Sequence, residues 1–378
     1  MPQIPFSTWV FGYPRVKVLG LHARWGDSID TIVQSLGGSS VSPSMRPPIW
    51  AARYWFIRVF LLRRLPKSAR RIVGLVRTVR CRVVITTDHL RSSIWLDTNL
   101  SQTQLFWIMH GLYLDRDFST PTKEGVHPPL TTRIQLLALS EYDREHYQRW
   151  GVKPGMIHVV GSANNALWLA ARKAKSSQAA GRFDICLIEK GISLNPDREH
   201  RSIYLDIYSK ILQMLGQYLN NEKRSLVVAL SNSDERSHVE KWIRMKLDYD
   251  FTVTDANERF ATYAASDHSR LTIGLASTAL LESLNRGNKI LSLNPTQFPN
   301  WDFPGIGISR MGSETSIDLQ LLTARINHLL ELSFESYRGE LPQELSRMIH
   351  DDSNAINEIQ EILRGSVDGM TRDSKSHR

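Results

Sequence analysis

The stretch TIGLASTALLE, Thr272–Glu282, changes its pattern half-way along. It opens with the apolar and β-branched residues of a buried strand, and the small residues from Gly274 to Ser277 then favour a turn. From Thr278 the sequence is rich in Ala and Leu, which predicts a helix. A strand that runs at once into a helix is the repeating unit of a parallel α/β sheet, so this stretch indicates the fold class.

The same alternation of strand and helix patterns extends along the chain. Strands are predicted at 16–22, 82–88, 104–111, 134–140 and 156–162 in the first half, and at 183–189, 225–231, 251–255, 271–277 and 289–294 in the second. Helical patterns separate the strands of the second half and continue from about 317 to 365. We therefore predict α/β architecture with largely parallel sheets, arranged as two successive Rossmann-like halves.

The predicted domains follow from this series of elements. An N-terminal Rossmann-like domain spans 1–165 and includes a basic helical block at 46–82. A polar, Ala- and Ser-rich linker at 166–182 connects it to a C-terminal Rossmann-like domain at 183–335. The end of the chain is polar, and we expect a disordered tail over 366–378.

Composition limits the class of protein. Apolar residues make up 42% of the chain and charged residues 22%, as in ordinary globular proteins. Cys81 and Cys186 are far apart in apolar runs, so we expect a reducing compartment, with neither a disulfide framework nor a metal cluster. The first residues lack a signal-peptide pattern and no run of about 18 apolar residues occurs, so we expect a cytoplasmic protein without a spanning helix.

The positive net charge of +9 is unevenly distributed. Between Asp30 and Asp88 there are eleven Arg or Lys and no acidic residue. The centre of this block is an apolar helical sequence interrupted by four arginines, Arg53, Arg58, Arg63 and Arg64. In a continuous helix, Arg53 and Arg64 share one face.

Two interpretations of this block stay open. It is either a core-facing helix with solvated arginines or a surface for anionic lipid head groups or an anionic polymer. A nucleic-acid-binding motif does not accompany the charge, so we predict no nucleic acid partner.

The strand-to-helix junction of the opening stretch carries candidate binding residues. In open α/β sheets, ligands bind at the carboxyl ends of the strands, where helix N-termini present free N–H groups. Gly274, Ser277 and Thr278 suit a phosphate at such a junction, and Glu282 suits the vicinal hydroxyls of a nucleotide ribose. The alternative is local, with Ser277 only capping the helix and Glu282 only complementing its dipole.

A histidine ends another predicted strand. His110 and Gly111 follow the apolar sequence FWIM, which places the imidazole at a carboxyl edge beside a residue without a side chain. It is either a catalytic acid or base or a structural histidine. Asp88 and Glu141, at neighbouring strand ends, are further candidates for the base.

Two more strands run into small or basic residues that suit a phosphate. These candidates for donor contacts are Gly161, Ser162, Lys190, Gly191 and Ser193. Each pattern alone is a general strand-to-loop signal.

Together the motifs are more specific. The HG at 110–111, the block LALSEYDREHYQRWGVKPGMIHVVGS at 137–162 and the block SRLTIGLASTALLESLNRGNKILSLNP at 269–295 resemble the GT-B glycosyltransferases. Among these, the chain is similar to bacterial surface-polysaccharide enzymes, which include capsule and Kdo-transferring enzymes and teichoic-acid CDP-glycerol polymerases. The resemblance covers roughly 82–300. It departs from the pattern at Met109, where relatives often have glutamine.

The resemblance implies a fold and a site. In the GT-B fold, two Rossmann-like domains face each other across a cleft, and a C-terminal helix, here 336–365, returns to the first domain. His110 matches the histidine that lines the cleft. Ser277, Thr278 and Glu282 match contacts to the phosphates and ribose of the donor nucleotide.

The function implied by the resemblance is glycosyl transfer. The donor is a nucleotide sugar, and the acceptor is a cell-surface polysaccharide or a lipid-linked glycan at the inner face of the membrane. Neither a metal nor a cofactor is expected, because helix dipoles and side-chain donors neutralise the departing phosphate. The alternatives are a glycerophosphotransferase or a sugar-nucleotide epimerase on the same fold, or a catalytically silent polyanion-binding protein.

Overall fold

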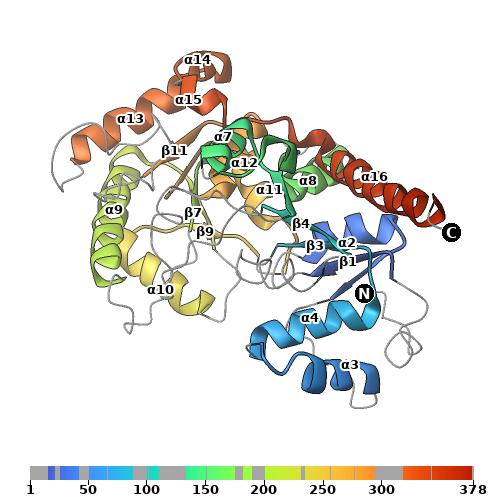
Figure 1. The fold of residues 1–378 in the computed structure, drawn as a ribbon. Coiled ribbons are helices and arrows are strands. Elements are labelled where there is room, and N and C mark those ends of the chain that lie inside the picture. Colours follow the sequence, from blue (N-terminus) through green and yellow to red (C-terminus); the bar gives the residue numbers. More distant parts are fainter. Residues whose placement is uncertain are drawn as a thin grey trace. The chain divides into compact units, whose positions relative to one another are not determined.

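The computed structural model of the chain describes residues 16–21, 26–41, 51–87, 100–109, 133–189, 201–293 and 318–376, apart from positions 66, 101, 150, 175–181, 231–234, 256, 276 and 342. These residues form two compact units, each built on one parallel sheet with helices (Figure 1). The first unit contains the described residues up to Ala170 and again from His350 onward, and the second contains Ala171–Ile349. The predicted α/β class is confirmed.

The first unit is built on a six-stranded sheet of order β2-β1-β3-β4-β5-β6, in which all paired strands are parallel. Its strands are β1 (Val18–Leu21), β2 (Ser39–Val41), β3 (Val83–Thr86), β4 (Gln104–Ile108), β5 (Ile134–Ala138) and β6 (Ile157–Val159). Five of these were predicted. The edge strand β2 was not, because its three residues, SSV, form no apolar run.

The helices of the first unit include α2 (Gly26–Ser35), α7 (Glu141–Arg149), α8 (Ala163–Ala174) and α16 (Ala355–Ser376). One hydrophobic cluster joins Ile29 and Val33 of α2 to Ile359 and Leu363 of α16 and to strand residues of the sheet. Figure 1 shows α16 next to α2, although more than 300 residues separate them in sequence. The C-terminal helix therefore belongs to the core of the first unit.

The linker predicted at 166–182 is wrong in its first part. Helix α8 continues to Ala174, because its sequence ANNALWLAARKA is rich in good helix formers. The Ser162 hydroxyl accepts a hydrogen bond from the backbone N–H of Asn165 at 3.2 Å and so caps its N-terminus.

The end of the chain also differs from the prediction. The helix expected over 336–365 is divided into α14 (Phe334–Gly339), α15 (Gln343–Ser346) and α16, since Gly339 and Pro342 interrupt the helical pattern. The disordered tail predicted for 366–378 is wrong, because α16 extends to Ser376. Val367 packs against the hydrophobic cluster and holds the helix beyond the predicted end.

The basic block forms α3 (Ala52–Phe56), a π-helical turn η1 (Ile57–Leu61) and α4 (Lys67–Val79). The π-helical turn closes with a hydrogen bond from the Leu62 N–H to the Ile57 carbonyl at 3.1 Å, and the chain then turns ahead of Pro66. The sequence had predicted that Arg53 and Arg64 share one face of a continuous helix. They do not, because the helical segment ends at Leu61, before Arg64. No helix in the described part of the chain is long and apolar enough to cross a bilayer.

The second unit is built on a five-stranded parallel sheet of order β11-β10-β7-β8-β9. Its strands, all predicted, are β7 (Phe183–Ile188), β8 (Leu226–Ala229), β9 (Thr252–Val253), β10 (Ser269–Gly274) and β11 (Ile290–Ser292). Its helices include α9 (Arg201–Glu222), α10 (Arg236–Leu247), α11 (Ala261–Asp267), α12 (Thr278–Asn285) and α13 (Leu319–Glu331). Helices α11 and α12 contact β10, whose carboxyl end leads directly into α12.

Candidate functional site

The predicted site residues divide into those that the structure describes and those that it does not. Five lie outside the described residues: Asp88, His110, Lys190, Gly191 and Ser193. The others form three groups: one in the second unit, at the junction of β10 and α12, one in the first unit, around the starts of α7 and α8, and the arginines of the basic block.

The junction of β10 and α12 has the geometry that the sequence predicted. Gly274 ends the strand so close to β7 that an added Cβ would lie 3.1 Å from the Ile188 carbonyl oxygen. Ser277 has an extended backbone, and its hydroxyl accepts a hydrogen bond from the Ala279 N–H at 3.3 Å. Ser277 is therefore the N-cap of α12, and Thr278 is the first residue of the helix.

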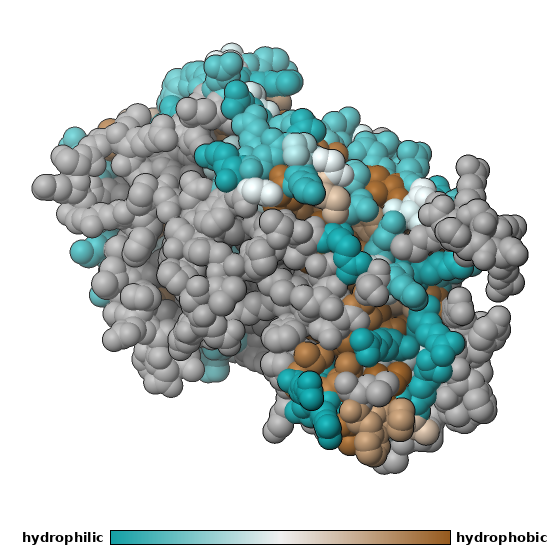
Figure 2. Space-filling view, in the orientation of Figure 1, coloured by the Kyte–Doolittle hydropathy of each residue, from teal (hydrophilic) through white to brown (hydrophobic). Residues whose placement is uncertain are grey.

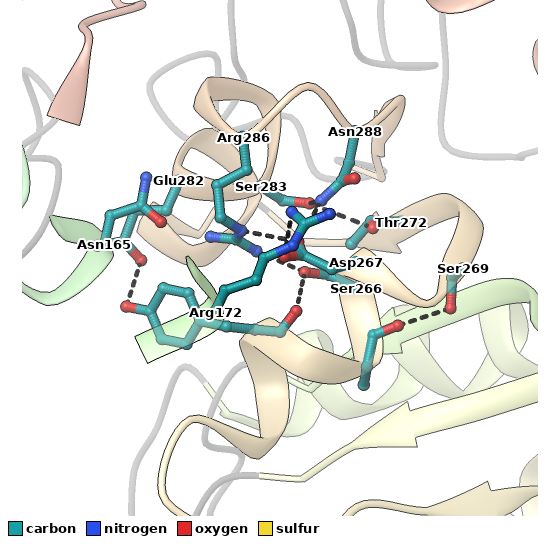
Figure 3. Close-up of polar contacts among 12 residues, drawn as sticks. Asn165, Arg172, Ser266, Asp267, Ser269, Thr272, Glu282, Ser283, Arg286 and Asn288 are labelled. Atoms are coloured by element: carbon teal, nitrogen blue, oxygen red, sulfur yellow. Dashed lines mark hydrogen bonds and ion pairs between the residues drawn. The ribbon is translucent and has the colours of Figure 1, made fainter. Parts of the chain in front are cut away.

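Glu282 lies one turn inside α12, and only 7% of its surface is exposed. Its carboxylate accepts a hydrogen bond from the Tyr263 hydroxyl of α11 at 2.9 Å (Figure 3). A buried carboxylate needs such partners, because desolvation disfavours its charged form. Glu282 is therefore a buried carboxylate held by a partner from a neighbouring helix.

A buried ion pair between Arg286 and Asp267 stabilises the packing of α11 and α12 at this junction. The Arg286 Nε atom lies 2.8 Å from Asp267 Oδ1, with side chains that are 1% and 3% exposed (Figure 3). The same carboxylate accepts hydrogen bonds from Asn288 at 2.7 Å and from Arg172 at 3.1 Å. The Arg286 guanidinium also lies 4.7 Å from the centroid of the Tyr263 ring. The network thus joins α11 to the end of α12 and fixes the ring that holds Glu282.

Sequence reasoning did not find Tyr263, Asp267 or Arg286. The pair Asp267 and Arg286 is separated by 19 residues. In a sequence, charged residues next to an apolar strand or helix are usually read as solvent-exposed ends of that element. The one signal that could have indicated the pair is position, since Asp267 directly precedes the β10–α12 motif and Arg286 directly follows it.

In the first unit, Ser162 and Asn165 bind a side chain of the same chain. The Ser162 N–H donates to Asp352 Oδ1 at 2.8 Å, and the Asn165 side-chain amide donates to Asp352 Oδ2 at 2.7 Å. Asp352 is buried, with 2% of its surface exposed. The start of α8 therefore binds an anionic group, as helix N-termini do, but this anion is the carboxylate that precedes α16. Ser162, a candidate for a donor contact, thus directs its backbone N–H to Asp352 of the same unit.

Gly161 is required by the same contact. Its φ of +76° lies in the left-handed region, and an added Cβ would collide with Asp352 Oδ1 and His350 Nδ1. His350 Nδ1 lies 3.7 Å from Asp352 Oδ1, and the Asp352 carboxylate raises the pKa of His350. The contact of Asp352 and His350 with the start of α8 was not predicted. Both residues come after the second unit in the sequence, about 190 residues from the helix that they contact.

Ser140 caps the N-terminus of helix α7. Its hydroxyl accepts a hydrogen bond from the Asp143 N–H at 3.3 Å and donates one to Asp143 Oδ2 at 2.7 Å. Asp143 is buried, and burial raises the pKa of its carboxyl to about 7. Glu141, the reserve candidate for the base, pairs with Arg144 and is half-exposed.

Glu141 lines an open groove of about 440 Å³ within the first unit. Other polar residues that line the groove are Arg144, His158, His350, Glu358 and Glu361. Its walls are thus built from α7, β6 and the chain around the start of α16.

The arginines of the basic block lie in different environments. Burial and the nearby Arg80 lower the pKa of Arg53. The Arg58 guanidinium lies 5.0 Å from the centroid of a Trp55 ring. Arg63 and Arg64 are exposed in the turn that follows η1.

Residues 185–362 match a protein family described as "putative O-antigen biosynthesis protein". The match covers just under half of the chain, and most of it lies in the second unit. No curated protein sequence matches the chain.

Several solved structures have a similar fold. The UDP-GlcNAc 2-epimerase from Neisseria meningitidis bound to UDP-GlcNAc is 14% identical with a TM-score of 0.57, and the alignment covers 92% of this chain and 100% of that one. The UDP-GlcNAc 2-epimerase from Methanocaldococcus jannaschii in complex with UDP-GlcNAc and UDP is 11% identical with a TM-score of 0.58, covering 92% and 99%. The wall teichoic acid polymerase TagF is 9% identical with a TM-score of 0.54, covering 94% and 90%.

These structures align over both units and not over one of them alone, since each alignment covers at least 90% of both chains. At such low identities the similarity establishes the architecture. The chain therefore has the GT-B fold that its sequence motifs predicted.

Proposed function

We propose that the chain is a glycosyltransferase that moves a sugar from a nucleotide-activated donor to a cell-surface polysaccharide or glycolipid acceptor. The observation that carries this proposal is the β10–α12 junction, where Ser277 and Thr278 begin a helix and the buried Glu282 is held by Tyr263. The family match to O-antigen biosynthesis includes this junction. Two of the similar structures contain UDP-GlcNAc, which supports a nucleotide sugar as the donor.

The junction suits the two polar parts of a nucleotide diphosphate sugar. The N-terminus of α12 combines backbone N–H groups with the positive end of the helix dipole, which stabilises phosphate charge. Glu282 is a strong acceptor for ribose hydroxyls, because an ionised carboxylate forms charge-assisted hydrogen bonds. Tyr263 fixes the orientation of that carboxylate and so lowers the entropic cost of binding. In this proposal the leaving diphosphate is stabilised without a metal, and activity persists in EDTA.

The catalytic base is proposed to be His110, which follows the buried end of β4. In this proposal a neutral imidazole accepts a proton from an acceptor hydroxyl as that oxygen attacks the anomeric carbon. Asp88 remains the second candidate at a strand end. Glu141 is a weaker candidate, because its carboxylate is paired with Arg144.

A donor-binding screen tests the proposal directly. Thermal unfolding is measured with UDP-, CMP-, GDP- and CDP-linked sugars, since a ligand that binds only the folded state raises the midpoint. The proposal requires that one nucleotide class raises the midpoint and that the shift is smaller in Glu282→Gln at the same ligand concentration. A chain that binds none of the four classes would not be a nucleotide-sugar enzyme.

Epimerisation is the second candidate function, because the two UDP-GlcNAc 2-epimerases align over 92% of the chain. The two activities differ in their products. A transferase releases the nucleotide only when an acceptor takes the sugar, whereas the epimerase reaction inverts one sugar carbon and needs no acceptor. Incubation of the bound donor alone, followed by NMR of the sugar ring, distinguishes them.

A further inference from the structure

The segment formed by α3 and η1 exposes an apolar face. Phe56, Val59 and Phe60 are 56%, 52% and 65% exposed, and the two phenyl rings contact each other with centroids 5.2 Å apart. Among the described residues, Met245 of α10 is the other large apolar side chain with comparable exposure. Three of these four side chains thus gather within five consecutive residues, which is unusual for a surface that faces only water.

The opposite face of the same segment explains why it folds. Tyr54, Ile57 and Leu62 are buried, and the Gly74 position of α4 lies against them, so that an added Cβ there would be 3.4 Å from the Tyr54 ring. The packing of the segment is therefore complete without Phe56 and Phe60. Phe56 and Phe60 are therefore exposed because they lie on the outer face of the segment, while its inner face is well packed.

Positive charge surrounds the apolar face. Arg58 lies on the Trp55 ring, while Arg63 and Arg64 follow the helical segment and are exposed. Residues 31–87 contain no acidic side chain, so this segment carries no negatively charged side chain of its own. Burial, and to a smaller extent the charge of Arg80, lower the pKa of Arg53. Figure 2 shows hydrophobic surface bordered by hydrophilic residues in the region of α3 and α4.

We propose that this apolar-basic face, formed by Phe56, Val59 and Phe60 with Arg58, Arg63 and Arg64, docks the protein on the surface of an anionic lipid bilayer. The phenyl rings enter the boundary between head groups and acyl chains, and the arginines bind lipid phosphates. Charge selects this occupant, because a second copy of the chain would bring like charges together. A soluble polyanion would satisfy the arginines but would leave the phenyl rings in water.

Vesicle flotation of the full chain measures the docking. Vesicles of phosphatidylglycerol and phosphatidylcholine should bind the protein, and vesicles of phosphatidylcholine alone should bind it much less. Phe56→Ser with Phe60→Ser should lower the partition coefficient about tenfold or more, because the apolar contribution scales with buried area. Arg63→Gln with Arg64→Gln should lower it about tenfold or more, since each basic residue near an anionic surface contributes about fivefold.

Matched controls exclude general effects of charge and hydrophobicity. Met245→Ser removes an equally exposed apolar side chain in the second unit, and Lys241→Gln with Arg338→Gln removes two charges from that unit. Neither control should change the partition coefficient more than about twofold, because neither removes a residue of the apolar-basic face. The melting midpoints of all variants should stay close to that of the original chain, since the substituted side chains are surface residues.

Insertion has a readout of its own. Phe60→Cys offers one exposed thiol, because Cys81 and Cys186 are buried and burial raises the pKa of both thiols to about 12. An NBD label at position 60 should shift its emission to the blue on anionic vesicles, whereas the same label at Met245→Cys should not. The proposal is overturned if the arginine variants lose binding while the phenylalanine variants and the label at position 60 do not respond, which would indicate a soluble polyanion site. A self-association in solution that the phenylalanine variants abolish, without binding to vesicles, would assign the face to a second copy.

Discussion

At the scale of single residues, Glu282 decides what the β10–α12 junction does. Glu282→Gln keeps the shape of the side chain and an oxygen that accepts from Tyr263, so the fold should be retained. The charged acceptor is lost, and because a hydrogen bond to a charged group contributes about 1.5–3 kcal/mol, donor affinity should fall about tenfold or more. Calorimetric titration with the donor measures the loss.

Tyr263→Phe is the matched control for that experiment. It removes the hydroxyl that orients the carboxylate but keeps the charge, so the loss of affinity should be smaller than in Glu282→Gln. Equal donor affinity in Glu282→Gln and the original chain would assign Glu282 to the stability of α12 alone.

His110 carries the prediction about chemistry. Loss of a general acid or base typically lowers the rate by about 10²–10⁴. His110→Ala should therefore lower turnover at least by that lower bound, while the donor dissociation constant and the melting midpoint change little. Steady-state kinetics with the donor found in the screen provide the measurement. Near-full turnover, or a variant that unfolds, would identify His110 as a structural histidine.

Asp143 predicts a pH dependence of stability. Burial raises its pKa from 3.8 to about 7, so the folded state holds this proton more tightly than the unfolded state. The stabilisation by the protonated form is complete below about pH 4 and is lost as the pH rises through about 7. Asp143→Asn should therefore raise the melting midpoint at pH 8 and leave it almost unchanged at pH 4. Glu145→Gln, an exposed position on the same helix, should show no such dependence, and a parallel response of both variants would contradict the assignment.

At the scale of elements, the position of α12 depends on the ion pair of Arg286 and Asp267. Arg286→Ala leaves a buried carboxylate without its main partner, which costs about 3–5 kcal/mol in comparable pairs. Arg172 binds the other oxygen of the same carboxylate but is 50% exposed, so Arg172→Ala should cost at most about 1 kcal/mol. Urea unfolding of the two variants compares these costs. Similar losses would mean that the network does not depend on the buried contact.

The elements also show what the sequence can predict. All ten strands that were expected are present, because an apolar run of four to six residues between turn residues is a local signal. The cap of α12 by Ser277 was one of the two expectations for this residue, because an N-cap is also a local signal. The partners Tyr263, Arg286 and Asp352 were not, since each meets its site through tertiary contacts over 19 to 190 residues.

At the scale of the whole molecule, the chain leaves the first unit within α8 and returns to it at His350. Asp352 joins these two points, because it binds the backbone of Ser162 and the side chain of Asn165. Local sequence patterns predict the helix that follows but give no information about which sheet it covers. The hydrophobic residues of α16 complete the core of the first unit, so this unit should depend on the last part of the chain for its stability.

Leu363→Ala tests this dependence. Leu363 is fully buried in the cluster shared with α2 and β3, and a buried Leu-to-Ala change costs about 2–5 kcal/mol. Because a chain of two units need not unfold in one step, hydrogen exchange gives the clearer measurement. Amides of β1 and β3 should lose protection in Leu363→Ala, whereas those of β7 and β10 in the second unit should keep it. Arg364→Ala, one residue further along and exposed, should leave both sets unchanged. Equal loss in both units would show that α16 stabilises the molecule as a whole, and unchanged protection of β1 and β3 would show that the first unit folds without it.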